Sequence, residues 1–156
     1  MTKPETGKTA PDFTLPASTE TDISLSDFLG KNIILYFYPK DGSSGCTLEA
    51  LNFKEYHQAY QDLQTVVIGI SKDSVKSHKN FINKHELPFI LLSDENAKVN
   101  KLYDVWKPKK MYGKEYEGTE RSTFIIDKKG ILVKEFRKVK VKGHAEEVLA
   151  FLQQLD

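Results

Sequence analysis

Cysteine is nearly absent from this sequence: among 156 residues there is one, Cys46. A single cysteine cannot form an intrachain disulfide, and it excludes the Cys-x-x-Cys pair on which a thioredoxin-type disulfide reductase depends. It also suits a reducing compartment. We therefore expect a cytoplasmic protein whose thiol, if it is used, acts without a second cysteine in the same chain.

An excess of one charge and long apolar runs are also missing. Lysine and arginine number 23 against 22 aspartate and glutamate residues, which gives no sign of nucleic acid or an anionic membrane as a partner. No apolar run approaches the length of a membrane span, and polar residues 1–10, expected to be loosely held, lack the apolar core of a signal peptide. The length fits one domain, residues 1–156.

The single cysteine stands within a strand, loop and helix pattern. Residues 33–38 form an apolar run typical of a strand buried on both faces, and the run stops at Pro39. After a loop of small residues, large apolar side chains recur at the helical spacing of three and four. They are Phe53, Tyr56, Tyr60 and Leu63. The pattern predicts a helix over residues 44–63 with Cys46 in its first turn, where unpaired N–H groups and the helix dipole favour a thiolate.

A lone cysteine is more often a small buried hydrophobe than a reactive group. Here its neighbours are Gly45 and Thr47 rather than apolar residues, which favours a reactive thiol. Ser43 can cap the helix or hydrogen-bond an oxygen ligand near the sulfur. Pro39 closes the strand and can wall the pocket without presenting an N–H.

Strand and helix patterns alternate beyond this region. Residues 66–70 indicate a second buried strand, and Ser74 is a candidate N-cap for a helix ending near His85. Strand, helix, strand, helix in this order favours a right-handed crossover and parallel pairing. Residues 121–126 and 131–136 predict a β-hairpin.

The C-terminal half of the sequence also contains a predicted loop and a last predicted helix. Residues 144–155 predict a last helix, and residues 106–120, which show no period, are interpreted as a loop. Its aromatic residues are Trp106, Tyr112 and Tyr116. They either line a hydrophobic rim at the site, line a subunit contact, or pack within the core or the loop. The histidines are scattered, without a second metal-type ligand at a convincing spacing, so we interpret them as solvated or helix-surface residues. They are His57, His78, His85 and His144.

The residues around Cys46 carry a family resemblance. Pro39-x-x-x-Ser43-x-x-Cys46 resembles the Pro-x-x-x-Thr/Ser-x-x-Cys signature of peroxiredoxins, and the wider run from Tyr36 is similar to the bacterioferritin comigratory protein, or peroxiredoxin Q, branch. Further matching segments precede the motif at residues 10–15 and 25–28 and follow it at residues 110–114 and 121–127. Two positions depart from the branch. Ser44 stands where many members have proline, and Leu51 where many have a second cysteine.

The resemblance implies an α/β, thioredoxin-like fold with a central mixed β-sheet flanked by helices. It implies a thiol-dependent peroxidase that reduces hydrogen peroxide and organic hydroperoxides through a sulfenic acid on Cys46. Ser43 and Pro39 belong to the signature. Arg121 matches the arginine that the family places against the sulfur, although alone it would read as an exposed strand-end residue. Glu49 resembles the glutamate that orients that arginine, although alone it is an ordinary acidic residue of a first helical turn.

No metal, haem or flavin cofactor is expected. Without a second cysteine the sulfenic acid must be resolved by an external thiol, and the sequence leaves thioredoxin, glutaredoxin and a small thiol open as donors. The resembling branch is often monomeric, so a monomer is expected rather than a dimer. A peroxide-sensing regulator or holdase that signals through oxidation of Cys46 stays open as an alternative function.

Overall fold

A five-stranded mixed β-sheet organises the chain, of which the computed structural model describes residues 4–155. The strand order is β5-β4-β3-β8-β9; the first three strands run parallel, and β8 and β9 are antiparallel to their neighbours. The bounds are Asn32–Phe37 for β3, Thr65–Ser71 for β4, Ile90–Ser93 for β5, Ser122–Ile126 for β8 and Leu132–Phe136 for β9. The strand run, the parallel crossover and the β8–β9 hairpin are as predicted.

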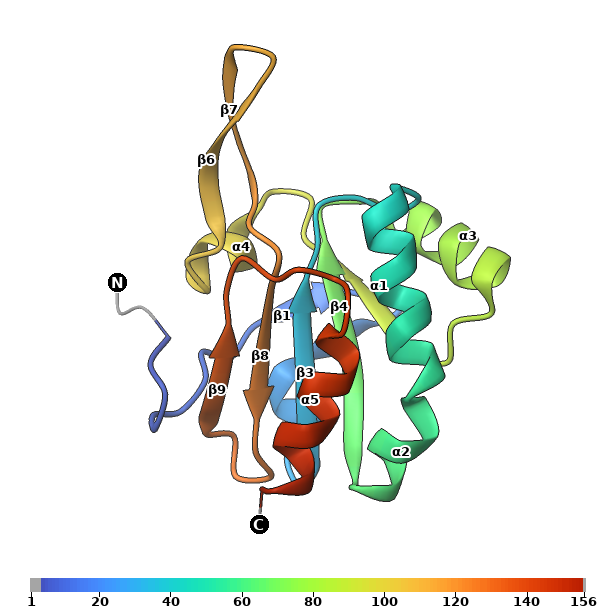
Figure 1. Cartoon of the computed structure of the whole chain (residues 1–156), viewed down its shortest axis with the longest axis vertical. Coiled ribbons are helices and arrows are strands. Elements are labelled where there is room, and N and C mark those ends of the chain that lie inside the picture. Colours follow the sequence, from blue (N-terminus) through green and yellow to red (C-terminus); the bar gives the residue numbers. More distant parts are fainter. Residues whose placement is uncertain (1–3, 156) are drawn as a thin grey trace.

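Strand β3 lies at the centre of the sheet and is buried along its whole length, which explains its continuous apolar sequence. Its side chains alternate between two hydrophobic clusters. Ile34 and Tyr36 face one side with residues of the helices α1, α2, α3 and α5. Leu35 and Phe37 face the other side with the N-terminal segment and α4. Figure 1 shows α1, α2 and α5 in front of the sheet. The helices span Ser44–Glu55 (α1), His57–Asp62 (α2), Val75–His85 (α3), Lys98–Leu102 (α4) and His144–Gln153 (α5).

The N-terminal segment closes the second face. Strands β1 (Thr14–Pro16) and β2 (Asp22–Ser24) pair with each other, and a 3-10 turn η1 (Leu25–Phe28) follows. The expectation that residues 1–10 are loosely held is wrong for residues 7–10, because the N–H groups of Gly7 and Ala10 donate to backbone carbonyls beside β9. Residues 1–3 lie outside the described part of the chain. No helix within residues 4–155 is long and apolar enough to cross a membrane.

The helix predicted over residues 44–63 is interrupted at Tyr56, which separates α1 from α2. Tyr56 has φ −96° and ψ 7°, outside regular helix geometry. The apolar spacing continues across this break because Phe53 and Tyr60 both reach the same core. A periodic pattern therefore predicts the buried face but not the interruption.

Residues 106–120 form a β-hairpin, not the loop we expected. Strand β6 (Trp106–Met111) pairs antiparallel with β7 (Lys114–Thr119) around a turn at Tyr112 and Gly113. Both turn residues have positive φ, at 53° and 77°, as a tight two-residue hairpin turn requires. Figure 1 shows this arm extending away from the sheet. Most of its side chains are at least partly exposed on both faces, so the sequence lacks the alternation of a half-buried strand.

Candidate active site

Strand pairing explains how Arg121 reaches Cys46 across 75 positions of sequence. Strand β3 leads through the loop of residues 38–43 into α1, and β8 pairs antiparallel with β3, so that Phe37 lies opposite Ser122. The start of β8 therefore lies where the chain leaves the sheet for α1. Arg121 directly precedes β8 and is carried to the first turn of that helix.

Cys46 lies in the first turn of α1 and is 1% exposed. Its backbone N–H donates to the hydroxyl oxygen of Ser43 over 3.4 Å, so Ser43 is the N-cap of the helix. The positive end of the helix dipole lies at this first turn, which favours negative charge on the sulfur. The predicted placement of Cys46 is confirmed.

Arg121 divides its guanidinium between the nucleophile and a carboxylate. Nη2 donates to Cys46 Sγ over 3.4 Å, and Nη1 donates to Glu49 Oε1 over 2.6 Å. Glu49 is one helical turn beyond Cys46, so a single planar fork spans both side chains. Gly45 lies close to this fork, because a Cβ at that position would lie 3.3 Å from Arg121 Nη2, a tight contact. A side chain at this position would require the guanidinium to shift by a few tenths of an ångström.

Burial and mutual electrostatic interaction set the pKa values of Glu49 and Arg121. Burial raises the pKa of Glu49 to about 7, and the nearby Arg121 only partly opposes that rise. Burial lowers the pKa of Arg121, but the charges of Glu49 and Cys46 outweigh it and the net pKa is raised. Arg121 thus stays cationic beside the sulfur. Glu49 Oε2 is buried and has no hydrogen-bond partner among the described residues. This fits a carboxyl group whose pKa is about 7 and which is therefore partly protonated at neutral pH.

Ser43 and Pro39 are placed less decisively than the other predicted residues. The Ser43 hydroxyl is exposed and donates to the carbonyl of Lys40 over 3.2 Å, so in this arrangement its hydrogen is already used within the loop. Pro39 is half-buried in the same loop, directly after β3 and Tyr38. The structure brings Cys46, Arg121 and Glu49 into contact. The direct parts assigned to Ser43 and Pro39 in the reaction stay predictions.

Comparisons with known proteins agree with this geometry. The profile of the AhpC/TSA family matches residues 6–135. Peroxiredoxin Bcp of Bacillus subtilis (strain 168) is 51% identical over 151 residues, covering 97% of this chain and 96% of that protein. The chain belongs to the AhpC/TSA family. As a peroxiredoxin of the Bcp/PrxQ kind it is a thiol-dependent peroxidase, and the resemblance inferred from its motifs is confirmed.

Solved structures of peroxiredoxins show the same thioredoxin-like fold. A cysteine-to-serine variant of PrxQ from Xylella fastidiosa superposes with a TM-score of 0.92 at 39% identity and covers 98% of each chain. The bacterioferritin comigratory protein of Xanthomonas campestris, studied for its alkyl peroxide reduction activity, superposes with a TM-score of 0.86 at 42% identity and covers 90% of each chain. The predicted fold class is therefore confirmed.

Two histidines of this peroxiredoxin are not the surface residues we expected. His78 and His144 are 0% and 2% exposed, and both rings are hydrogen-bonded on both nitrogens. His144 contacts Thr123 and Glu147, and burial lowers the pKa of its imidazole. His78 recurs with Val75, Phe81 and Ile82 on one face of α3, and that spacing was a usable signal of burial.

His78 also has neighbours that sequence spacing could not reveal. Its Nδ1 and one carboxylate oxygen each from Asp41 and Asp73 lie within 4.8 Å of one another. These oxygens already accept hydrogen bonds from Ser77 and from the Asp41 backbone N–H. The group therefore works as a hydrogen-bonded cluster beneath the loop that leads to Cys46.

A basic residue of the hairpin arm is a second feature missed by the sequence reasoning. Lys109 lies on β6 and is half-buried. Burial lowers the pKa of its ammonium, and so does the charge of Arg121, whereas the charge of Cys46 opposes the change. The arm therefore lies within electrostatic reach of the peroxiredoxin site. Tyr112 is 97% exposed at the tip of this arm, so it does not pack in the core.

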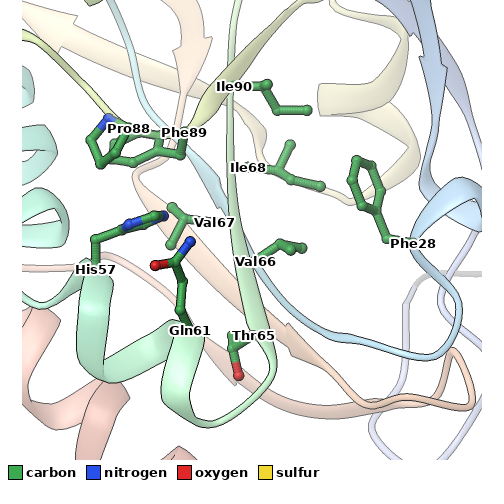
Figure 2. Close-up of a pocket in the computed structure, with 10 residues that line it drawn as sticks. All are labelled: Phe28, His57, Gln61, Thr65, Val66, Val67, Ile68, Pro88, Phe89 and Ile90. Atoms are coloured by element: carbon green, nitrogen blue, oxygen red, sulfur yellow. The ribbon is translucent and has the colours of Figure 1, made fainter.

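A separate cavity lies between α2 and the strands β4 and β5 (Figure 2). Figure 2 shows the side chains of His57 and Gln61 projecting from α2 toward Pro88 and Phe89. Burial lowers the pKa of His57. The lining residues include none of the five signature and site residues of the peroxiredoxin centre. We therefore assign this cavity no part in peroxide chemistry.

Proposed function

We propose that Cys46 is the peroxidatic thiol of a one-cysteine peroxidase that acts on hydrogen peroxide and organic hydroperoxides. The thiolate sulfur attacks one peroxide oxygen, the O–O bond breaks, and Cys46 becomes a sulfenic acid. The other oxygen leaves as hydroxide or alkoxide and takes up a proton, which gives water or an alcohol. The observation that carries this proposal is the guanidinium of Arg121, 3.4 Å from Cys46 Sγ at the start of α1.

In this proposal, the fixed charges around the sulfur serve both steps of the attack. Arg121 and the helix N-terminus stabilise the thiolate before the reaction, and the same groups stabilise the negative charge that develops on the leaving oxygen. Glu49 holds the guanidinium in place through the 2.6 Å bond to Nη1. Ser43 keeps the first turn capped, and Pro39 shapes the loop wall.

An external thiol completes the cycle. It attacks the sulfenic sulfur, a mixed disulfide forms and water leaves; a second thiol then releases Cys46 as the thiol. Thioredoxin, glutaredoxin and a small thiol all satisfy this chemistry. Cys46 is the one cysteine of the sequence, which supports external rather than internal resolution. We further propose a cytoplasmic, monomeric enzyme, in line with the single cysteine and with the branch it resembles.

Peroxide consumption with each candidate donor tests this function. The wild-type protein should consume many equivalents of hydrogen peroxide when a donor is supplied, and Cys46→Ser should consume none above background. If the wild type reacts once and does not turn over with any of the three donors, the proposed resolution by these external thiols is wrong, and a sensing role for Cys46 is favoured instead.

A further inference from the structure

A buried polar cluster lies directly under the loop that carries the active-site signature. Asp41 is at its centre, and its carboxylate accepts from three side chains. Tyr38 OH donates to Oδ1 over 2.5 Å, Ser77 Oγ donates to Oδ2 over 2.8 Å, and His78 Nδ1 meets Oδ2 at 2.8 Å. Asp41 is therefore hydrogen-bonded to Tyr38, the residue after β3, and to two consecutive residues of α3.

The proton positions at His78 follow from its two neighbours. Nε2 is 3.0 Å from the carbonyl oxygen of Leu92, which can only accept, so Nε2 carries a hydrogen. Nδ1 faces the carboxylate oxygen of Asp41, and a second hydrogen lies between these two atoms. The side chains are 0% and 6% exposed, so the imidazole and the carboxylate form a buried, hydrogen-bonded pair. Burial alone would raise the pKa of Asp41, but the bonds from His78 and Tyr38 outweigh it and lower that pKa.

The pair acts on the backbone that leads to the nucleophile. The Asp41 backbone N–H donates to Asp73 Oδ2 over 2.7 Å, which fixes the main chain of the loop as well as the side chain. Lys40, the preceding residue, supplies the carbonyl that accepts from the Ser43 hydroxyl, and Ser43 in turn caps Cys46. The Lys40–Asp41 peptide unit thus joins the hydrogen bonds from α3 and Asp73 to those that cap the first turn of α1.

We propose that Asp41 and His78 are positioning residues for the peroxidase reaction. Their hydrogen-bonded pair ties the loop of residues 39–43 to α3 and β5, and so fixes the peroxide-facing backbone and the capped first turn of α1. The inference rests on the proposed function of Cys46. Removing either partner leaves the other buried and unpaired, so the loop relaxes and the in-line approach of peroxide to the sulfur is lost.

The test compares two reactions of the same thiol. The rate constant of Cys46 with hydrogen peroxide depends on an oriented peroxide, whereas alkylation by iodoacetamide needs only an accessible thiolate. In Asp41→Asn and in His78→Gln we expect the peroxide rate constant to fall about tenfold or more, with alkylation changed by less than about threefold. Because the two residues act as one unit, the double variant should fall no further than the worse single variant.

Asp94→Asn is the matched control. Asp94 is likewise a buried carboxylate, but its oxygens accept from Val99 and Asn100 at the start of α4 and from no residue of the loop. This variant should keep the wild-type ratio of the two rate constants even if it loses stability. Ser77→Ala removes one donor to Asp41 and leaves the Asp41–His78 hydrogen bond in place. It covers the case in which the other variants fail to fold, and its peroxide rate should fall by about two- to fivefold.

The outcomes separate this inference from the proposed function. If the wild type itself does not react with peroxide, the proposed function fails. If the wild type reacts, but the folded Asp41, His78 and Ser77 variants keep its rate, only the positioning role is wrong. Equal losses in peroxide and iodoacetamide reactivity, or a double variant whose loss is the product of the single losses, also overturn it.

Discussion

At the scale of single residues, Arg121 is the side chain on which the site depends, because one guanidinium contacts both Cys46 and Glu49. We expect Arg121→Ala to lower the rate constant of Cys46 with hydrogen peroxide by about 100-fold or more, since a preorganised charge is lost from the transition state. Stopped-flow kinetics measures this directly. Arg137→Ala is the matched control, because Arg137 bonds the carbonyls of Tyr103 and Asp104 instead.

Lysine at the same position gives a finer test of the fork. Arg121→Lys keeps the positive charge but cannot donate to the sulfur and to Glu49 with fixed geometry. We expect a rate constant between those of the wild type and Arg121→Ala. A lysine variant as fast as the wild type would show that charge alone suffices, and an alanine variant within threefold of Arg137→Ala would contradict the role given to Arg121.

Glu49 provides a pH test at the same scale. Its pKa is raised in the folded protein from the ordinary 4.5 to about 7, because burial disfavours the charged carboxylate. A raised pKa means that the stability linked to this group is fully present below the unfolded pKa and is lost as pH rises through 7. Above that value the folded protein carries the full cost of a buried charge.

Glu49→Gln removes this titration and keeps an oxygen that can accept from Arg121. Relative to the wild type, the variant should therefore gain stability between about pH 5 and about pH 8, on the order of 2 kcal/mol. Urea unfolding at the two pH values measures the difference. An identical difference at both pH values would contradict the raised pKa.

At the scale of elements, the packing of the three parallel strands β3, β4 and β5 depends on one glycine of β4. Gly69 of β4 lies between Tyr36 of β3 and Leu91 of β5, and a Cβ there would come within 2.7 Å of Leu91 and 2.9 Å of Tyr36. Gly69→Ala should cost about 1–3 kcal/mol of unfolding free energy. In the background of Leu91→Ala the cost should shrink, because the tighter of the two contacts is gone. Equal costs in the two backgrounds would contradict the packing argument.

Helix α1 supports a second prediction at this scale. Leu51 stands five residues after Cys46, where many members of the resembling branch have a second cysteine. Five residues of α-helix rise about 7.5 Å, whereas a disulfide tolerates Cα separations of up to roughly 6.8 Å. In Leu51→Cys a disulfide to Cys46 can therefore form only after the first turns of α1 unwind.

Peptide mapping of Leu51→Cys under non-reducing conditions measures this opening. We expect the link to accumulate more slowly than peroxide is consumed, because nothing in the native chain requires α1 to unwind. A link that forms as fast as peroxide is consumed would show a helix that opens readily. If no link forms, α1 stays closed and resolution is wholly external.

At the scale of the whole molecule, the sequence predicted the parts that depend on local pattern. The apolar run of β3, the cap at Ser43 and the motif around Cys46 located the nucleophile, and the resemblance added Arg121 and Glu49. What it could not predict depends on contacts between distant segments. The pairing of His78 with Asp41 and the hairpin arm of residues 106–119 leave no periodic signal, since polar partners and exposed strands do not alternate with apolar residues.

Whether residues 1–156 fold as a single domain stays a prediction, although the described strands β3, β4, β5, β8 and β9 share one sheet with a hydrophobic cluster on each face. The topology of this sheet also positions a charged residue of the proposed site. The antiparallel pairing of β3 with β8 brings Arg121 to the start of α1, so the positive charge at the sulfur is a consequence of topology.

The most direct measurement is the chemical state of Cys46 after one equivalent of hydrogen peroxide without any thiol donor. With a sulfenic-acid trap present, mass spectrometry of the peptide containing Cys46 should show stoichiometric trapping. Without the trap, excess peroxide should drive the same residue to sulfinic acid. Adding a thiol donor after the single equivalent, before any excess peroxide, should return the sulfenic acid to the unmodified thiol. Peroxide consumption that leaves Cys46 untrapped and unmodified, or that persists in Cys46→Ser, would contradict the account.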